Sequence, residues 1–411
     1  MKIAIPKERR SNEARVAASP DSVKKLAALG FEVVVEKGAG KGAAVTDAAF
    51  EAAGATIAKD AKAVLAGADL VLKVQRPTAE ECAALPRGAI LIATLDPYRA
   101  GDELEALAKA GVTAFAMELL PRITRAQSMD VLSLQANLAG YKAVIDAASH
   151  YGRGFPMMMT AAGRMNPAHV MVMGAGVAGL QAIATARRLG AVVHATDVRP
   201  AAKEEVQSLG AKFVAVEDEE FKQAQTAGGY AKEMSEEYKR KQAALIAETL
   251  PKMDVVITTA LIPGRPAPRL ISAEMVESMK PGAVIVDLAV DNGGNCELSE
   301  PGKVVEKHGV TIVGHLNTAS RLAADASQLY ANNLFNFLSL LWDKQEKKLA
   351  IDWDDEIVAQ TLVTRDGAVV HPKLRKDDAP APAKPAAPEE KAESAADEKT
   401  GEAAGKGESN G

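Results

Sequence analysis

A glycine-rich turn between two apolar runs constrains this 411-residue chain more than any other feature. Residues 170–173, Val-Met-Val-Met, lead into Gly174, Gly176 and Gly179, and a second apolar run ends at Asp197. In a GxGxxG turn the first glycine permits the tight turn. The second lets the backbone approach a pyrophosphate, and the third lets helix and strand pack closely. The pattern therefore predicts a strand, turn and helix that bind a dinucleotide.

Asp197 stands where an acidic side chain hydrogen-bonds the adenosine ribose hydroxyls. Its charge would repel a 2′-phosphate, so the sequence favours NAD(H) over NADP(H). Arg199, close behind it, is a counterargument because a nearby arginine can accommodate that phosphate. Val177 at the start of the helix and Val198 beside the acid are expected to line the same site, where the helix N-terminus offers N–H groups to the phosphates.

Short apolar runs alternate with helical stretches in two series, which predicts parallel sheets covered by helices. The first series comprises residues 2–6, 31–37, 70–74, 89–94 and 113–117. The second begins at His169 and continues at 192–197, 212–216, 254–259, 283–288 and 310–314, a six-strand doubly wound pattern. The expected fold is α/β, with two Rossmann-like parallel-sheet domains and a cofactor cleft between them.

Two long helical patterns set the expected domain division. Residues 133–151 predict an interdomain helix, and residues 323–347 predict a helix long enough to return to the first domain. The expected domains are a discontinuous N-terminal α/β domain over 1–135 and 323–378, and an NAD-binding Rossmann domain over 136–322.

Composition excludes several classes of protein. The net charge of −5 gives no basic surface for nucleic acid, and the two cysteines lie far apart without partners at metal-ligand spacing. No run approaches the ~18 apolar residues of a membrane span, and the chain starts directly with a strand pattern, so a cytoplasmic protein without direct membrane insertion is expected. Residues 379–411 lack Val, Ile, Leu, Met and aromatic side chains and are expected to be a disordered tail rich in Pro, Ala, Glu and Lys.

The expected cofactor crevice lies beyond the carboxyl ends of the strands, where Ala260 and Leu261 follow a strand end. Residues 122–133 join the domains and are dense in polar groups. They either reach the nicotinamide half or form an exposed hinge loop. The polar insertion 217–241, which contains Gly229 and Tyr230, is either a lid over the nucleotide or a plain surface insertion.

A proton-transfer residue is hard to find in this sequence. A dehydrogenase that acts on an alcohol or amine moves a proton as well as a hydride. Of the six histidines, only His315 follows a strand end in a suitable place. A site without such a residue is compatible with direct hydride transfer between two nicotinamides.

The motifs together resemble those of the NAD(H)-binding domain I subunits of proton-translocating NAD(P) transhydrogenases, which are relatives of alanine dehydrogenase. The resemblance spans about residues 1–376. It is carried by residues 5–8, 12–17, 73–77, 122–133, 174–179, 197–199, 228–234, 280–282 and 291–294.

The resemblance implies roles for individual residues. Arg122, Asp130 and Ser133 would hold the nicotinamide end, and Gln127 would lie where the two nicotinamides meet. Tyr230 and Met234 would belong to a mobile loop that closes over the nucleotide. The residues expected to bind NAD(H) are Gly174, Gly176, Val177, Gly179, Asp197, Val198, Arg199, Gly229, Tyr230, Met234, Ala260, Leu261, Gln127, Ser128, Met129 and Asp130.

The implied activity is that of the Si-specific/Re-specific, proton-translocating type: hydride passes from bound NADH to NADP⁺ on a partner. The implied partners are membrane-spanning and NADP(H)-binding subunits. They would hold a homodimer of this chain at the cytoplasmic face of the inner membrane.

An alanine-dehydrogenase-like enzyme is the alternative. Its pattern is matched by Arg15, Lys73 and Asp291, but Asp96 stands at its histidine position, and a carboxyl with a pKa near ~4 is a poor proton donor. A non-catalytic NAD(H)-sensing module is a third possibility.

Overall fold

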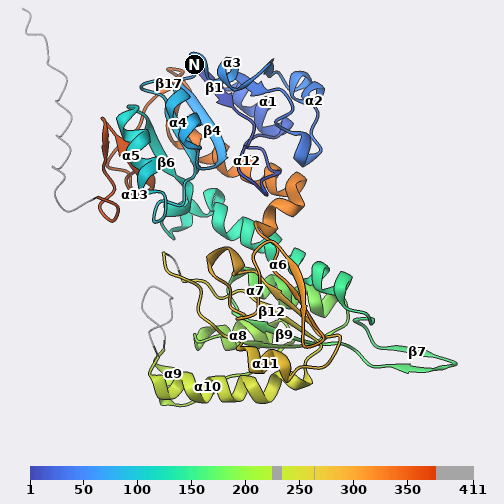
Figure 1. Cartoon of the computed structure of the whole chain (residues 1–411). Helices are drawn as coiled ribbons and strands as arrows, with labels where there is room; N and C mark the ends of the chain where they lie inside the picture. The colour runs from blue at the N-terminus through green and yellow to red at the C-terminus, as the bar shows by residue number, and fades with distance from the viewer. Residues whose placement is uncertain (225–233, 263, 376–411) are drawn as a thin grey trace, which may run out of the picture.

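Two lobes, each built around one mainly parallel sheet, make up the structure (Figure 1). It is a computed structural model that describes residues 1–224, 234–262 and 264–375. The expected tail, Gly229 and Tyr230 lie outside the described residues. Within that part of the chain, no helix is both long and apolar enough to cross a bilayer.

The first sheet has the strand order β3-β2-β1-β4-β5-β6-β18-β19. Its parallel part follows the doubly wound order 3-2-1-4-5-6. The strands are β1 (Lys2–Ile5), β2 (Glu32–Glu36), β3 (Thr56–Ala58), β4 (Leu70–Gln75), β5 (Ile90–Thr94), β6 (Thr113–Ala116), β18 (Leu362–Arg365) and β19 (Ala368–Val369). Because β18 pairs with β6, the end of the described chain returns to the first lobe.

The second sheet repeats this order as β11-β10-β9-β12-β13-β15-β14. Its strands are β9 (His169–Met173), β10 (Val192–Thr196), β11 (Lys212–Phe213), β12 (Val255–Thr258), β13 (Val284–Asp287), β14 (Val304–Lys307) and β15 (Val310–Val313). In both sheets the order reverses beside the first strand, and the carboxyl ends at such a reversal are where α/β proteins bind ligands.

The predicted α/β class is confirmed, but the sheets are mixed rather than wholly parallel. β18 and β19 form an antiparallel hairpin, as do β14 and β15. The pairs Asp366-Gly367 and His308-Gly309 connect them, and all four of these residues have positive φ. Two-residue turns with both φ values positive are the favoured hairpin connection. These short turns carry the signal that the strand predictions did not use.

Helices cover both faces of each sheet. The first lobe contains α1 (Pro20–Ala28), α2 (Asp47–Ala52), α3 (Ala61–Leu65), α4 (Ala79–Ala84), α5 (Gly101–Lys109), α12 (Ala323–Leu340) and α13 (Glu356–Thr361), with the short pair β16 (Trp342–Asp343) and β17 (Lys348–Leu349). The second contains α7 (Val177–Arg188), α8 (Ala201–Ser208), α9 (Glu219–Lys222), α10 (Glu236–Thr249) and α11 (Ala273–Glu277). Apolar clusters fill both faces of each sheet.

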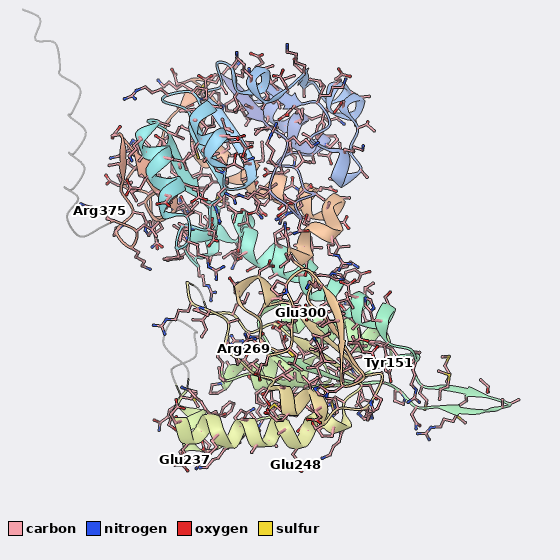
Figure 2. The ribbon with its side chains drawn as sticks, viewed as in Figure 1. Tyr151, Glu237, Glu248, Arg269, Glu300 and Arg375 are labelled. Atoms are coloured by element: carbon pink, nitrogen blue, oxygen red, sulfur yellow. The ribbon has the colours of Figure 1, made fainter. Side chains whose placement is uncertain are left out.

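The predicted insertion 217–241 is partly helical. Asp218 caps α9, and Ser235 caps α10 by accepting the backbone N–H of Tyr238. α10 buries Tyr238 and Ile246, whereas Glu237 and Glu248 lie on its outer face (Figure 2). The expectation of a continuous loop is wrong for these residues because the two caps were not read as helix starts.

The helix α6 (Val131–His150) joins the lobes (Figure 1). It begins two residues before the predicted helix because the Asp130 carboxylate accepts the Ser133 N–H as an N-cap. It packs closely on α7, since a Cβ at Gly140 would collide with the backbone carbonyl of Ala178. The helix that starts at the glycine-rich turn is thereby fixed against the helix that starts in the first lobe.

Replacing Gly140 by Ala tests this packing. Alanine gains about 1 kcal/mol of helix propensity, but overpacking against backbone costs about 1–3 kcal/mol because no flexible group can yield. We expect a lower midpoint of thermal unfolding. Gly152→Ala is the matched control, because its Cβ meets nothing within 4 Å. Equal midpoints for the two variants would show that α6 and α7 can separate without cost.

Candidate nucleotide site

The turn after β9 has the geometry that the glycine spacing predicts. Gly174 has φ +102 and donates its N–H to the carbonyl of Thr196 at 2.9 Å. Thr259 Oγ1 donates to the Gly174 carbonyl at 3.0 Å. A Cβ at Gly179 would overlap that same carbonyl, so only glycine lets α7 start this close to the strand.

Gly176 differs from the other two glycines. Its φ of −74° and ψ of −168° are open to any residue, and a Cβ there would meet no protein atom within 4 Å. Neither backbone conformation nor packing therefore requires glycine at this position. The open space lies at the N-terminus of α7, where N–H groups attract phosphate. The turn fits a dinucleotide pyrophosphate.

Asp197 and Arg199 form one hydrogen-bonded unit beside this turn. Asp197 Oδ2 accepts the Ala175 N–H at 2.8 Å, and Oδ1 accepts the Arg199 N–H at 2.8 Å. The Arg199 guanidinium donates Nε to Oδ1 at 3.0 Å and Nη2 to Oδ2 at 3.2 Å. It also donates to the Ala175 carbonyl at 3.1 Å. The arginine that argued against NAD(H) is thus paired with the acid that favours it.

The segment after β12 is held by a residue that sequence reasoning missed. Asn295 is fully buried and exchanges two hydrogen bonds with the backbone of Ala260, donating to its carbonyl at 2.9 Å and accepting its N–H at 3.0 Å. Leu261, Val177 and Val198 remain exposed. Asn295 directly follows the Gly-Gly pair of residues 293–294, which was the available signal.

The loop 122–133 contains the 3₁₀ helix η3 (Thr124–Met129) and leads into α6. Arg122, Gln127 and Ser128 are exposed, whereas Met129 is buried in the first-lobe core. Asp130 accepts the Ser133 N–H at 2.9 Å and the Ser133 hydroxyl at 2.5 Å. A carboxylate has further lone pairs, so this pair can still accept from an amide.

Two other predicted residues lie elsewhere. Met234 is buried with Phe221, Ala224 and Tyr238 at the base of α9 and α10. His315 lies near Arg321, and burial and that positive charge lower its pKa. The predicted lid residues Gly229 and Tyr230 lie outside the described residues.

Family comparisons agree with this geometry. Residues 4–139 match "Alanine dehydrogenase/PNT, N-terminal domain" and residues 143–372 match "Alanine dehydrogenase/PNT, C-terminal domain". The chain belongs to the alanine dehydrogenase/PNT family. The family predicted from the motifs is confirmed.

Within the alanine dehydrogenase/PNT family, two kinds of relative are similar to this chain. The first of the two parts of the NAD(P) transhydrogenase alpha subunit of Rhodospirillum rubrum is 63% identical over 379 residues, which is 91% of this chain and 99% of the relative. The crystal structure of a transhydrogenase from Sinorhizobium meliloti has a TM-score of 0.82 and 59% identity, covering 90% of this chain and 100% of that one. Alanine dehydrogenase of Mycobacterium tuberculosis is 36% identical over 304 residues, covering 73% and 76%.

The cations that match the alanine dehydrogenase pattern are already paired with carboxylates. Arg15 donates to Glu13 at 2.6 and 2.8 Å, and these bonds outweigh burial to lower the pKa of Glu13 to about 2. Lys73 is 1% exposed and pairs with Glu81 at 2.9 Å and with Glu8 at 3.3 Å. A substrate carboxylate would have to displace these internal partners.

The acidic positions of that pattern are also occupied. Asp96 has a left-handed backbone, φ 50, and pairs with Arg76 at 2.9 Å. Asp291 accepts the Asn317 N–H at 3.0 Å. A carboxylate paired with arginine stays ionised at neutral pH, so Asp96 does not supply the missing proton donor.

Gly176→Ala tests the open space at the start of α7. The chain should fold with an unchanged thermal midpoint because no protein atom is displaced. NADH affinity, measured by calorimetric titration, should fall by about 10-fold or more because the methyl group occupies the pyrophosphate path. An unchanged dissociation constant together with an intact fold would contradict the placement of the pyrophosphate here.

Asp197→Ser tests the pairing with Arg199. Removing the carboxylate frees the guanidinium for a 2′-phosphate, and one charge-assisted hydrogen bond contributes about 1.5–3 kcal/mol. NADPH affinity should therefore rise by about 10-fold or more, while NADH affinity falls. The double variant Asp197→Ser/Arg199→Met should lose the gain. If it retains the gain, Arg199 is not the phosphate-binding group.

Proposed function

We propose that this chain is the NAD(H)-binding subunit of a proton-translocating NAD(P) transhydrogenase. It would pass hydride from NADH to NADP⁺ held by a partner subunit, and membrane-spanning subunits would couple the transfer to proton movement. The observation that carries the proposal is the exposed loop 122–133 at the start of α6, the helix that also packs on the dinucleotide turn.

The geometry of α6 supports this reading. Ser133 lies seven residues before Gly140, so the Asp130–Ser133 pair is about 10 Å along the helix from the Ala178 contact. A dinucleotide whose pyrophosphate sits at the start of α7 can extend its nicotinamide half toward this pair. Gln127 and Arg122 are exposed beside it, and Leu132 is 54% exposed. A reaction partner would therefore approach from solvent.

The reaction itself asks little of acid–base chemistry. The C4 hydride of NADH moves to C4 of NADP⁺, which gives NAD⁺ and NADPH without release of a proton. The residues of this chain would act by positioning: Asp130 and Ser133 would fix the carboxamide, and Arg122 and Gln127 would align the ring with its acceptor. Holding the reacting atoms about 3–3.5 Å apart supplies most of the rate enhancement in such a step.

The partner arrangement extends this proposal. NADP(H) would be bound by another subunit, and the chain would be held at the cytoplasmic face of the inner membrane through its partners. The discontinuous first domain, residues 1–135 and 323–378, would carry the loop, and residues 136–322 would bind NAD(H). The tail 379–411 has no assigned role.

The decisive experiment mixes the purified chain, loaded with NADH, with an NADP⁺-loaded transhydrogenase NADP(H)-binding domain. Single-turnover absorbance should report nicotinamide-to-nicotinamide transfer. Gln127→Asn should slow transfer by about 10-fold or more with little change in NADH affinity, because Gln127 acts at the ring junction. Absence of transfer by the parent chain with an active partner would refute the function. NAD⁺ reduction by L-alanine would instead support the alanine dehydrogenase alternative.

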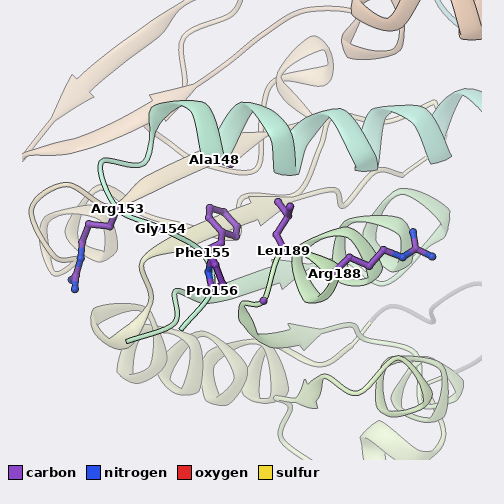
Figure 3. A pocket seen from close by; sticks show the side chains of 8 residues that line it. Ala148, Arg153, Gly154, Phe155, Pro156, Arg188 and Leu189 are labelled. Atoms are coloured by element: carbon purple, nitrogen blue, oxygen red, sulfur yellow. The ribbon is translucent and has the colours of Figure 1, made fainter. Parts of the chain in front are cut away.

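A homodimer is the proposed assembly, and an exposed hairpin supports it. β7 (Met158–Thr160) and β8 (Gly163–Met165) project from the second lobe (Figure 1). Met157, Met158 and Met159 are exposed on it. At its base lies a hollow of about 510 Å³, with Phe155 and Leu189 between Arg153 and Arg188 (Figure 3). Methionines adapt well to interfaces, so this hairpin fits a second copy of the chain.

Met159→Asp tests this assembly, because Met159 is 72% exposed in the single chain. A charge placed in an apolar interface should shift sedimentation velocity profiles from dimer toward monomer. Val304→Asp, at an exposed position on β14, serves as the control. A dimer that persists in Met159→Asp would place the interface elsewhere.

A further inference from the structure

We infer that Asn333 and Asn336 of α12 are positioning residues for the loop that carries Gln127 and Asp130, an inference that rests on the proposed function. Both side-chain amides donate to one acceptor, the backbone carbonyl of Ser128, at 2.9 and 3.0 Å. Ser128 lies directly after Gln127 and two residues before Asp130, so its carbonyl is a fixed point between the two functional side chains.

The loop depends on such external bonds. η3 has no side-chain cap at its start, and a 3₁₀ helix of this length has poor internal hydrogen-bond geometry. Its few backbone bonds include Ala126 N–H to Ile123 at 3.0 Å and Asp130 N–H to Gln127 at 3.3 Å. Contacts with the surrounding lobe therefore decide where the exposed side chains of η3 point.

The asparagines suit this role by their spacing. Residues three apart on a helix share one face, and a carbonyl oxygen has two lone pairs. Both amides can therefore donate to Ser128 at once. Hydrogen bonds from two points restrain the carbonyl in direction as well as distance, which a single bond does not do.

Asn333 gives the more specific sign. It is 2% exposed, and its Oδ1 is buried without a hydrogen-bond partner. A buried polar side chain is costly, and a buried acceptor without a partner requires an explanation. The Asn333 amide nitrogen donates to the loop. An apolar residue would fill this core position without that cost, so the amide is explained by its bond to Ser128.

A second attachment lies on the other side of Gln127. Arg125 donates to Asp355 at 2.6 Å, and Asp355 also caps α13. Gln127 is therefore exposed between two fixed points, one on α12 and one on α13, while Ala126 and Met129 are buried in the core. Exposed position and restrained backbone together are what a residue at a ring junction requires.

The test replaces both asparagines by leucine, which has a similar size and no donor. With the NADH-loaded chain and an NADP⁺-loaded partner domain, we expect the transfer rate to fall about 10- to 100-fold, because a displacement of about 1 Å costs this much. The NADH dissociation constant should change less than about 3-fold, since the dinucleotide turn lies in the other lobe.

Single variants and a matched control separate positioning from folding. Asn336→Leu alone, at a half-buried position, should slow transfer without lowering the thermal midpoint. Asn336→Gln keeps a donor and should remain within about 3-fold of the parent rate. Asn332→Ala is the control: the same residue type on the same helix, which accepts from Lys25 at 3.2 Å and not from the loop. A transfer rate for Asn333→Leu/Asn336→Leu equal to that of Asn332→Ala would overturn the inference.

Hydrogen–deuterium exchange provides a readout that does not need turnover. Backbone amides of residues 124–130 should exchange at least about 10-fold faster in Asn333→Leu/Asn336→Leu than in the parent chain, and unchanged exchange would also overturn the inference. If the parent chain transfers no hydride but exchange rises as expected, the proposed function fails while the attachment of the loop stands.

Discussion

The contact between α6 and α7 is the interaction on which the rest of this structure depends. At Gly140 the interlobe helix approaches the Ala178 backbone so closely that no side chain fits between them. One end of α6 is capped by Asp130 in the first lobe, and its middle rests on the helix that starts at the dinucleotide turn. A loop of one lobe is thereby set at a fixed distance from a nucleotide held by the other.

Paired charges give the crevice its chemical character. Arg199 is bound to Asp197, Arg15 to Glu13, and Lys73 to Glu81. Cations that are satisfied internally do not offer a ready site for a small acidic substrate. What remains exposed at the crevice is a set of neutral, amide-bearing and apolar groups. Such a surface suits the positioning of one ring against another more than the transfer of a proton.

Much of the fold could be predicted because its signals are local. The alternation of apolar runs predicted most strands of both sheets, and α6 was missed only at its start. The short strand β3 and the antiparallel hairpins β14–β15 and β18–β19 were not predicted. Their pairing depends on partners distant in sequence and on turns of two residues with positive φ. Apolar periodicity does not report such turns.

The sequence by itself determined the dinucleotide turn, because glycine spacing and the acid after the second strand follow from local backbone geometry. It also determined that Gln127, Asp130 and Ser133 belong to one polar loop. Only the tertiary structure decided that Arg199 is tied to Asp197, that Asn295 holds Ala260, and that Asn333 and Asn336 hold Ser128. These bonds join residues brought together by folding, and an amide or guanidinium chooses its acceptor by distance and direction, neither of which the order of residues contains.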